Sequence, residues 1–372
     1  MRRIKVGKHY ISDADSVFIL PEAGVNHNGS LKRAKDLIQK AAEAGAQGIK
    51  FQTYKAETLV TKSAPRFWDW EGEQKKEGTQ FDSYSILDKL PWHAYKDLSS
   101  YANELGIEFI STPFDEKAVD MLDALGSPAF KIASSDLTYL PFLRYVAKKG
   151  KPIFLSTGAA TLGEVEEAIR TIEAAGNRQI VVMHCTLCYP TEPKDANLRI
   201  IQTLRRTFGY PVGLSDHTMG TAIPPAAVAL GARLIEKHYT VDKTLGLSAD
   251  HWLSIDPIEL KQIVEHVKQV QIALGTDEKR VFPAEEHTYL YDKRSLVSTQ
   301  AIKKGEEITT SMLTGKRPGT GIPTKFFDLI VGSAAQLDIP EDTTLTWDMV
   351  TQRTPLEFET LRSPAARIPE IV

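Results

Sequence analysis

One unit recurs along most of the chain and constrains its fold more than any other feature. From residue 17, a short apolar and often β-branched run is followed by a polar or glycine-containing turn and then by a segment with helical periodicity. This alternation predicts βα units and a parallel sheet. The eight runs predicted as strands are Val17–Leu20, Gly48–Phe51, Glu108–Ser111, Ala129–Ile132, Pro152–Leu155, Ile180–His184, Val212–Ser215 and Leu234–Lys237.

The segments between these runs place apolar residues at helical spacing, as in 31–44, 94–105, 162–175 and 258–274. Eight strands and eight crossovers within about 250 residues are the arithmetic of a (β/α)8 barrel, the TIM-barrel fold. The alternative is an open doubly wound sheet, but no GxGxxG motif follows the first strand. A barrel predicts that active-site residues follow the strands, on the loops at the C-terminal face.

The chain has 372 residues, more than one barrel needs, so a second and smaller domain is expected. We predict a barrel domain over residues 1–275 and a linker over 276–292, where helical periodicity is lost. Short strands then indicate a small, mainly β domain over 293–352. Residues 353–372 contain three prolines and are predicted to form an irregular tail.

Composition excludes several classes of protein. The formal net charge of −3 shows no basic excess of the kind that nucleic acid or membrane surfaces attract. Apolar runs are far shorter than the ~20 residues of a membrane span. The basic segment 1–10 lacks the apolar core of a signal peptide, so a cytoplasmic location is expected. The two cysteines, Cys185 and Cys188, form a lone CxxC that favours neither a zinc site nor a redox pair.

Two lysines inside strand-like apolar runs point to an anionic ligand. A charge in such a run is costly unless it is paired or binds something. Lys50 and Lys131, with Ser134 and Ser156, would neutralise a phosphate and a carboxylate together. Alternatively, each lysine pairs with a neighbouring acid such as Asp136.

His217 and His238 end two neighbouring strands and form a candidate metal pair. Two imidazoles would leave open positions on a divalent ion for water and substrate, although a lone histidine is more often an ordinary core residue. Glu22, directly after the first strand, is the candidate acid or base, unless it only holds a lysine. Asp250 could serve either role, and His27 and His251 are further metal candidates on loops.

The ordered motifs of the chain resemble those of the sialic acid synthase family, which includes N-acetylneuraminate, legionaminate and pseudaminate synthases. They are PEAGVNHNG, KFQ, STPFD, KIASSD, LSTG, HCTLCYPT, GLSDHT and IEKHYT. The segment from Lys293 to Ile322 resembles the antifreeze-like (SAF) domain of that family. The resemblance covers roughly residues 16–350.

This resemblance implies a transferase that condenses phosphoenolpyruvate with an N-acylated amino-sugar aldehyde and water. The product is a nine-carbon 2-keto acid, and phosphate is released. The acceptor would be N-acetylmannosamine or a diacetamido-trideoxyhexose. A divalent cation, manganese with magnesium or cobalt as alternatives, would polarise the aldehyde.

The same resemblance assigns roles residue by residue. It implies that phosphoenolpyruvate is bound by Lys50, Gln52, Lys131, Ser134, Ser156 and Tyr189. It implies that His217 and His238 bind the metal, and that Glu22 and Asp250 act in catalysis together with the two lysines. It implies that the sugar is bound by Asp136, Asp250 and Arg317. It further implies a domain-swapped homodimer in which Arg317 reaches the partner's barrel.

Two departures from the family pattern bear on the sugar. Leu187 stands where many relatives carry Asn, and Asp136 stands where they carry Glu. The long connection 54–91, with Trp68 and a charged stretch, is either a lid or an insertion packed by its own aromatics. Competing functions are a synthase for a phosphorylated sugar, a Schiff-base aldolase and a non-catalytic sugar-binding barrel.

Overall fold

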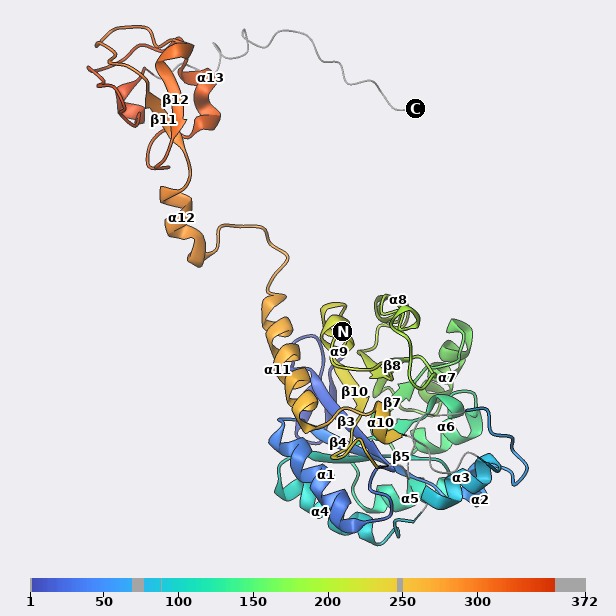
Figure 1. Ribbon diagram of the computed structural model, residues 1–372. Coiled ribbons are helices and arrows are strands. Elements are labelled where there is room, and N and C mark those ends of the chain that lie inside the picture. The colour runs from blue at the N-terminus through green and yellow to red at the C-terminus, as the bar shows by residue number, and fades with distance from the viewer. Residues whose placement is uncertain (1, 69–76, 88, 246–249, 352–372) are drawn as a thin grey trace. The chain divides into compact units, whose positions relative to one another are not determined.

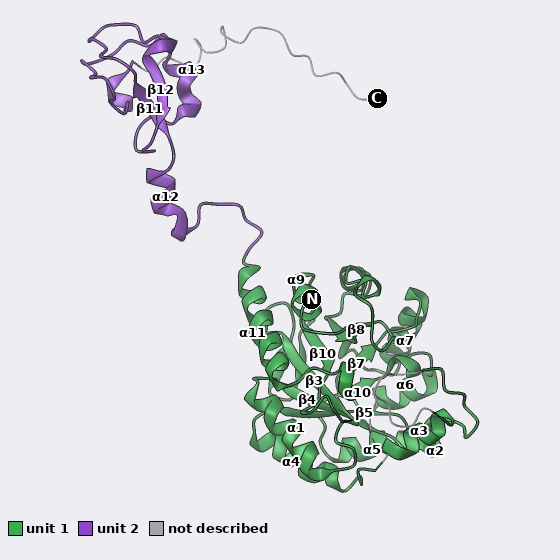
Figure 2. Ribbon diagram, in the orientation of Figure 1, with its two compact units in different colours: residues 1–275 green, residues 276–372 purple. Residues whose placement is uncertain are grey.

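The structure is a computed structural model that describes residues 2–68, 77–87, 89–245 and 250–351. The chain forms two compact units, Met1–Gly275 and Thr276–Val372 (Figure 2). The predicted tail 353–372 lies outside the described residues, as does part of the connection 54–91.

The first unit is a closed barrel of eight parallel strands (Figure 1). In order around the barrel they are β10 (Leu234–His238), β3 (Phe18–Gly24), β4 (Gly48–Thr53), β5 (Glu108–Pro113), β6 (Phe130–Ile132), β7 (Ile153–Ser156), β8 (Ile180–Cys185) and β9 (Val212–Asp216). Each coincides with one predicted strand, so the predicted (β/α)8 fold is confirmed.

Helices surround the barrel because each has one apolar stripe that packs on the strands. They are α1 (Leu31–Glu43), α4 (Ala94–Glu104), α5 (Glu116–Ala124), α6 (Leu140–Ala147), α7 (Leu162–Ala174), α8 (Ile200–Phe208), α9 (Ile223–Ala229) and α11 (Pro257–Ala273). Capping boxes start two of them, with Thr161 and Glu164 at α7 and Asp256 and Glu259 at α11. No helix among the described residues has the length and apolarity to cross a bilayer.

A hairpin that the sequence analysis did not predict precedes the barrel. Strands β1 (Ile4–Val6) and β2 (His9–Ile11) pair antiparallel. Ile4, Val6 and Ile11 are buried in one cluster with barrel residues such as Phe18 and Leu20. Strands of three residues are too short for their alternation to stand out from chance.

The second unit contains the small β domain. Strand β11 (Ser295–Ser298) pairs antiparallel with β12 (Leu313–Lys316). A separate apolar core, which includes Leu296, Ile308 and Leu345, is buried beneath them. The stretch predicted as a linker contains a short helix, α12 (Glu286–Tyr291). Helix α13 (Phe327–Ile330) completes the domain.

Candidate functional site

A cavity of about 610 Å³ opens at the carboxyl ends of the barrel strands. A volume of that size suits a small-molecule site. Apart from the loop histidines His27 and His251, the sequence-predicted site residues of the barrel line it, namely Glu22, Lys50, Gln52, Lys131, Ser134, Asp136, Ser156, Tyr189, His217, His238 and Asp250. Arg317 belongs to the second unit, where its guanidinium pairs with Asp292 at 2.8 Å.

Strand register brings residues from distant parts of the sequence to one level. On β3, Glu22 pairs with Lys50 of β4 on one side and with His238 of β10 on the other. The register then shifts, because Gly24 pairs with Phe51 and Ala23 is the extra residue of a bulge. Bulges re-aim side chains and are frequent beside active sites.

The floor of the cavity is a buried network of two lysines and two glutamates. Lys50 Nζ lies 2.5 Å from Glu22 Oε2 and donates to Thr112 Oγ1 at 3.1 Å. Gln52 donates to the other oxygen of Glu22 at 3.0 Å. Burial alone would lower the pKa of Lys50, but Glu22 and Glu236 outweigh it and the pKa is raised.

Glu236, on β10, is a floor residue that the sequence analysis left out of the site. Its Oε1 lies 3.8 Å from Lys50 Nζ and 3.7 Å from Lys131 Nζ, and it accepts from Ser215 Oγ at 2.9 Å. Burial would raise its pKa, but the two lysines reverse the shift and lower it. A carboxylate inside the apolar run LIEKH was the signal that could have identified it.

Two hydroxyl groups complete the floor, from Ser134 in a short 3-10 helix and Ser156 at the end of β7. Ser134 Oγ accepts from the Gly158 N–H at 2.9 Å. A Cβ at Gly158 would lie 2.8 Å from that oxygen and 3.0 Å from Cys185 Sγ, so only glycine allows this approach. Ser156 Oγ is buried and has no hydrogen-bond partner among the described residues. Such a group is available to a ligand.

The two predicted metal ligands lie side by side, with ring centroids 5.3 Å apart. The Tyr189 ring contacts both, at 4.1 Å from His217 and 5.6 Å from His238. His217 Nδ1 hydrogen-bonds the carbonyl oxygen of Thr186 at 2.9 Å. A neutral imidazole held in this way keeps its Nε2 lone pair for a metal, as is usual for histidine ligands.

The chemistry of these donors fits a divalent cation with open positions. His238 Nδ1 lies 3.3 Å from Asp250 Oδ2, and both side chains line the cavity. Burial lowers the pKa of His238, but Asp250 raises it further, to above its ordinary value. Within the described ranges, no three His, Cys, Asp or Glu side chains form a ready-made metal cluster. A cation here would therefore rely on ligands from substrate or water.

The other histidine candidates are not among the residues lining the cavity. His27 stacks on Phe51, and its Nδ1 accepts from the Gly29 N–H at 3.0 Å. His251 bonds Thr240 at 2.7 Å and Asn28 at 3.2 Å. Burial lowers the pKa of each imidazole to about 4. Both rings are held by these contacts outside the described cavity lining.

The wall of the cavity above the floor is mostly apolar, and the connection 54–91 supplies much of it. It carries α2 (Ala56–Leu59) and α3 (Gln80–Leu87), and the short α10 (Asp250–Leu253) contributes Asp250 to the lining. The wall residues of this connection include Leu59, Val60, Phe67, Trp68, Tyr84, Ile86 and Leu87. Its aromatics also contact one another, since the rings of Trp68 and Tyr84 lie 6.0 Å apart.

Polar groups interrupt this wall, among them Gln80, Ser83 and Asp136. Asp136 lines the cavity, and its Oδ2 has no hydrogen-bond partner among the described residues. Burial raises its pKa to about 6, only partly opposed by Lys131. Leu187, the other departure, also lines the cavity and is 44% exposed.

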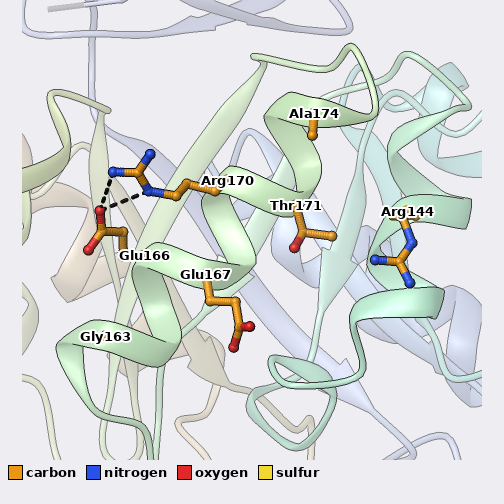
Figure 3. A pocket seen from close by; sticks show the side chains of 7 residues that line it. All are labelled: Arg144, Gly163, Glu166, Glu167, Arg170, Thr171 and Ala174. Carbon is orange, nitrogen blue, oxygen red and sulfur yellow. Dashed lines mark hydrogen bonds and ion pairs between the residues drawn. The ribbon is translucent and has the colours of Figure 1, made fainter.

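A second hollow lies on the outer surface between α6 and α7 (Figure 3). Its polar content is an i,i+4 pair, in which Arg170 Nη2 lies 2.6 Å from Glu166 Oε1, with Arg144 across the groove. Exposed pairs of this kind contribute little. None of the predicted site residues lines this hollow.

Comparison with known proteins identifies the family to which this site belongs. Residues 37–279 match the NeuB family model, and residues 293–351 match the SAF domain. The chain belongs to the NeuB family. The predicted resemblance to sialic acid synthases with a SAF domain is thereby confirmed.

Relatives of this family align with nearly the whole chain. The chain is 41% identical to N,N'-diacetyllegionaminic acid synthase of Legionella pneumophila, over 90% of this chain and 94% of the relative. It is 35% identical to N-acetylneuraminate-9-phosphate synthase of Mus musculus, over 90% and 92%. The crystal structure of N-acetylneuraminic acid synthetase from Leptospira borgpetersenii is similar, with a TM-score of 0.68 and 32% identity over 77% of this chain and 95% of that one.

Proposed function

We propose that the protein is a nonulosonic acid synthase, a carbon–carbon bond-forming transferase that condenses phosphoenolpyruvate with an unphosphorylated, N-acylated amino-sugar aldehyde. The single observation that carries this is the cavity floor, where two lysines, two serines and an acid–histidine cluster meet below an apolar wall. Relatives named as legionaminic and pseudaminic acid synthases support the reaction class.

The floor suits phosphoenolpyruvate as the donor. Lys50 and Lys131 would hold its phosphate and carboxylate, because buried ammonium groups form strong charge-assisted bonds to both. Ser134, Ser156, Gln52 and Tyr189 would supply further bonds. Held in this way, the donor presents C3 to the aldehyde carbon, and a new C–C bond forms there. Water then adds at C2, and phosphate leaves by cleavage of its C–O bond.

Glu22 is our candidate for proton transfer at the reacting atoms. It lies on the floor beside Lys50 and level with His238. Asp250, next to His238, would orient the aldehyde or water. A divalent cation held by His217 and His238, manganese for preference, would supply Lewis-acid polarisation of the aldehyde when bound.

The acceptor is inferred from the wall. Among the described lining residues, Lys50 and Lys131 are the sole lysine or arginine side chains, and both belong to the floor. Within the described lining, a second phosphate would therefore meet no cation on the wall, which argues against a phosphorylated sugar; Lys75 and Lys76 of the connection lie outside the described residues. Apolar groups such as a methyl or an acetamido methyl would gain about 0.8 kcal/mol per buried carbon there. Asp136 would accept from an N–H or O–H of the sugar.

The assembly that we propose is a domain-swapped homodimer in the cytoplasm, with Arg317 reaching the acceptor of the partner's barrel. Exposed apolar side chains at the strand-end loops of the barrel support a covered rim. Tyr139 is 55%, Met219 49% and Leu162 45% exposed. Exposed apolar side chains near a cavity mouth would be covered in such an assembly.

The test is phosphate release from phosphoenolpyruvate with manganese and a panel of acceptors, with and without chelator. The panel contains N-acetylmannosamine, its 6-phosphate, and diacetamido-trideoxyhexoses of different stereochemistry. We expect phosphate release with an unphosphorylated sugar, and we expect chelation to abolish it. The kcat/KM for the deoxy sugars should exceed that for N-acetylmannosamine by about 10- to 100-fold. Release with the 6-phosphate alone would reject the proposed acceptor class. Trapping of a covalent adduct by borohydride would instead indicate a Schiff-base aldolase.

A further inference from the structure

Glu236 joins residues from opposite sides of the barrel. In the strand order β10-β3-β4-β5-β6-β7-β8-β9, β10 lies four strands from β6 in either direction. Glu236 of β10 nevertheless approaches Lys131 of β6 to 3.7 Å across the interior. The same oxygen, Oε1, lies 3.8 Å from Lys50 of β4.

Lys131 depends on this contact more than Lys50 does. Lys50 has a closer acid, Glu22, at 2.5 Å and a hydroxyl partner in Thr112. Lys131 is 4% exposed, and besides its contact with Glu236 it donates to the carbonyl oxygen of Ile132 at 3.3 Å. Burial lowers the pKa of Lys131, and Glu236 is the largest opposing influence. Without Glu236, no acid of the described residues would form an ion pair with this buried ammonium group.

These contacts involve only one of the two carboxylate oxygens of Glu236. Oε1 also accepts from Ser215 Oγ at 2.9 Å, which orients the group. Oε2 is buried with no hydrogen-bond partner among the described residues, and the residue lines the cavity. A purely structural ion pair would be expected to satisfy both oxygens.

We propose that Glu236 is a positioning residue that braces the cavity floor, holding the ammonium groups of Lys50 and Lys131 so that phosphoenolpyruvate is bound at both. This rests on the proposed function only in taking phosphoenolpyruvate as the ligand. Glu236 acts through the lysines, and its Oε2 is left without a hydrogen-bond partner among the described residues.

The first test is direct binding of phosphoenolpyruvate, measured by calorimetry in chelator and without acceptor, so that turnover does not enter. Glu236→Gln keeps the shape and removes the charge. We expect its Kd to rise about 10- to 100-fold. Ser215→Ala keeps the charge of Glu236 and removes one hydroxyl donor to its carboxylate, so its Kd should rise less than that of Glu236→Gln. Glu236→Asp keeps the charge but has a side chain one methylene shorter. Its Kd should lie between those of Glu236→Gln and the wild type.

Steady-state kinetics separate positioning from general damage. In Glu236→Gln the KM for phosphoenolpyruvate should rise while the KM for the acceptor stays within about twofold. An equal rise in both, or a fall in kcat alone, would contradict the proposal.

A double-mutant cycle tests whether Glu236 acts through Lys131. Lys131→Met with Glu236→Gln removes one charge of each sign, so the double variant can be compared with Lys131→Met even if Glu236→Gln alone does not fold. The double variant should bind phosphoenolpyruvate within about threefold of Lys131→Met alone. If the two substitutions weakened phosphoenolpyruvate binding independently and additively, Glu236 would not act through Lys131 and the proposed role would be rejected.

The two proposals can fail separately. If wild-type protein does not bind phosphoenolpyruvate, the proposed function fails. If the wild type binds it and Glu236→Gln binds it equally or more tightly, only the role of Glu236 is rejected.

Discussion

Asp136 is a cavity residue whose charge should respond to pH near neutrality. Its folded-state pKa of about 6 lies above the ordinary value of 3.8 because burial disfavours the ion. Between these values the folded state holds the proton and the unfolded state does not. Stability therefore falls as pH rises through this window, the opposite of a salt-bridged carboxylate.

Asp136→Asn should remove this dependence. From pH 4.5 to 7, the free energy of unfolding of the wild type should fall relative to the variant by about 1–3 kcal/mol. Urea unfolding of both proteins at several pH values measures the difference, and groups common to both cancel. Parallel pH curves would show that Asp136 is not buried as an acid.

His217 carries a prediction about metal binding. Because its Nδ1 is held by the Thr186 carbonyl, only Nε2 is left to bind a cation. His217→Ala should abolish metal-dependent turnover and weaken manganese binding, measured by electron paramagnetic resonance, at least tenfold. The exposed His93 supplies a control, since His93→Ala should change neither. Unchanged binding in His217→Ala would exclude the metal assignment.

At the scale of elements, the hairpin of β1 and β2 should stabilise the barrel without serving its chemistry. Ile11 is fully buried against the barrel core, whereas its neighbour Tyr10 is 36% exposed. Ile11→Ala should lower the free energy of unfolding by about 2–5 kcal/mol. Tyr10→Ala should lower it by about 1 kcal/mol or less.

Activity distinguishes this element from the site. The cavity lining contains no residue of the hairpin, so kcat of Ile11→Ala should match the wild type well below its Tm. A large loss of kcat in folded protein would show that the hairpin reaches the chemistry.

At the scale of the whole molecule, the swapped dimer can be tested by complementation. Glu22→Gln impairs the barrel, and Arg317→Ala impairs the small domain. In a swapped heterodimer, one site combines the intact barrel of one chain with the intact small domain of the other. Random pairing should then restore roughly a quarter of wild-type activity at low acceptor concentration. No recovery in mixed dimers would mean that Arg317 serves its own barrel or none.

Most of the fold was predictable because the barrel repeats a local pattern. Each strand is an apolar run bounded by a turn, so the eight strands and the barrel could be predicted from the sequence. The residues at strand ends were equally legible, since charges such as Lys50 and Lys131 stand out in apolar runs. The hairpin was missed because its strands have three residues each.

By itself the sequence determined the barrel, its second domain and the face on which the chemistry lies. Only the tertiary structure decided which charges meet. Lys50 and Lys131 share the carboxylate of Glu236 because closure of the sheet places β10 opposite β6, a relation between strands about a hundred residues apart. Likewise, the apolar wall forms because the connection 54–91 lines the cavity, and spacing along a chain carries no record of such long-range contacts.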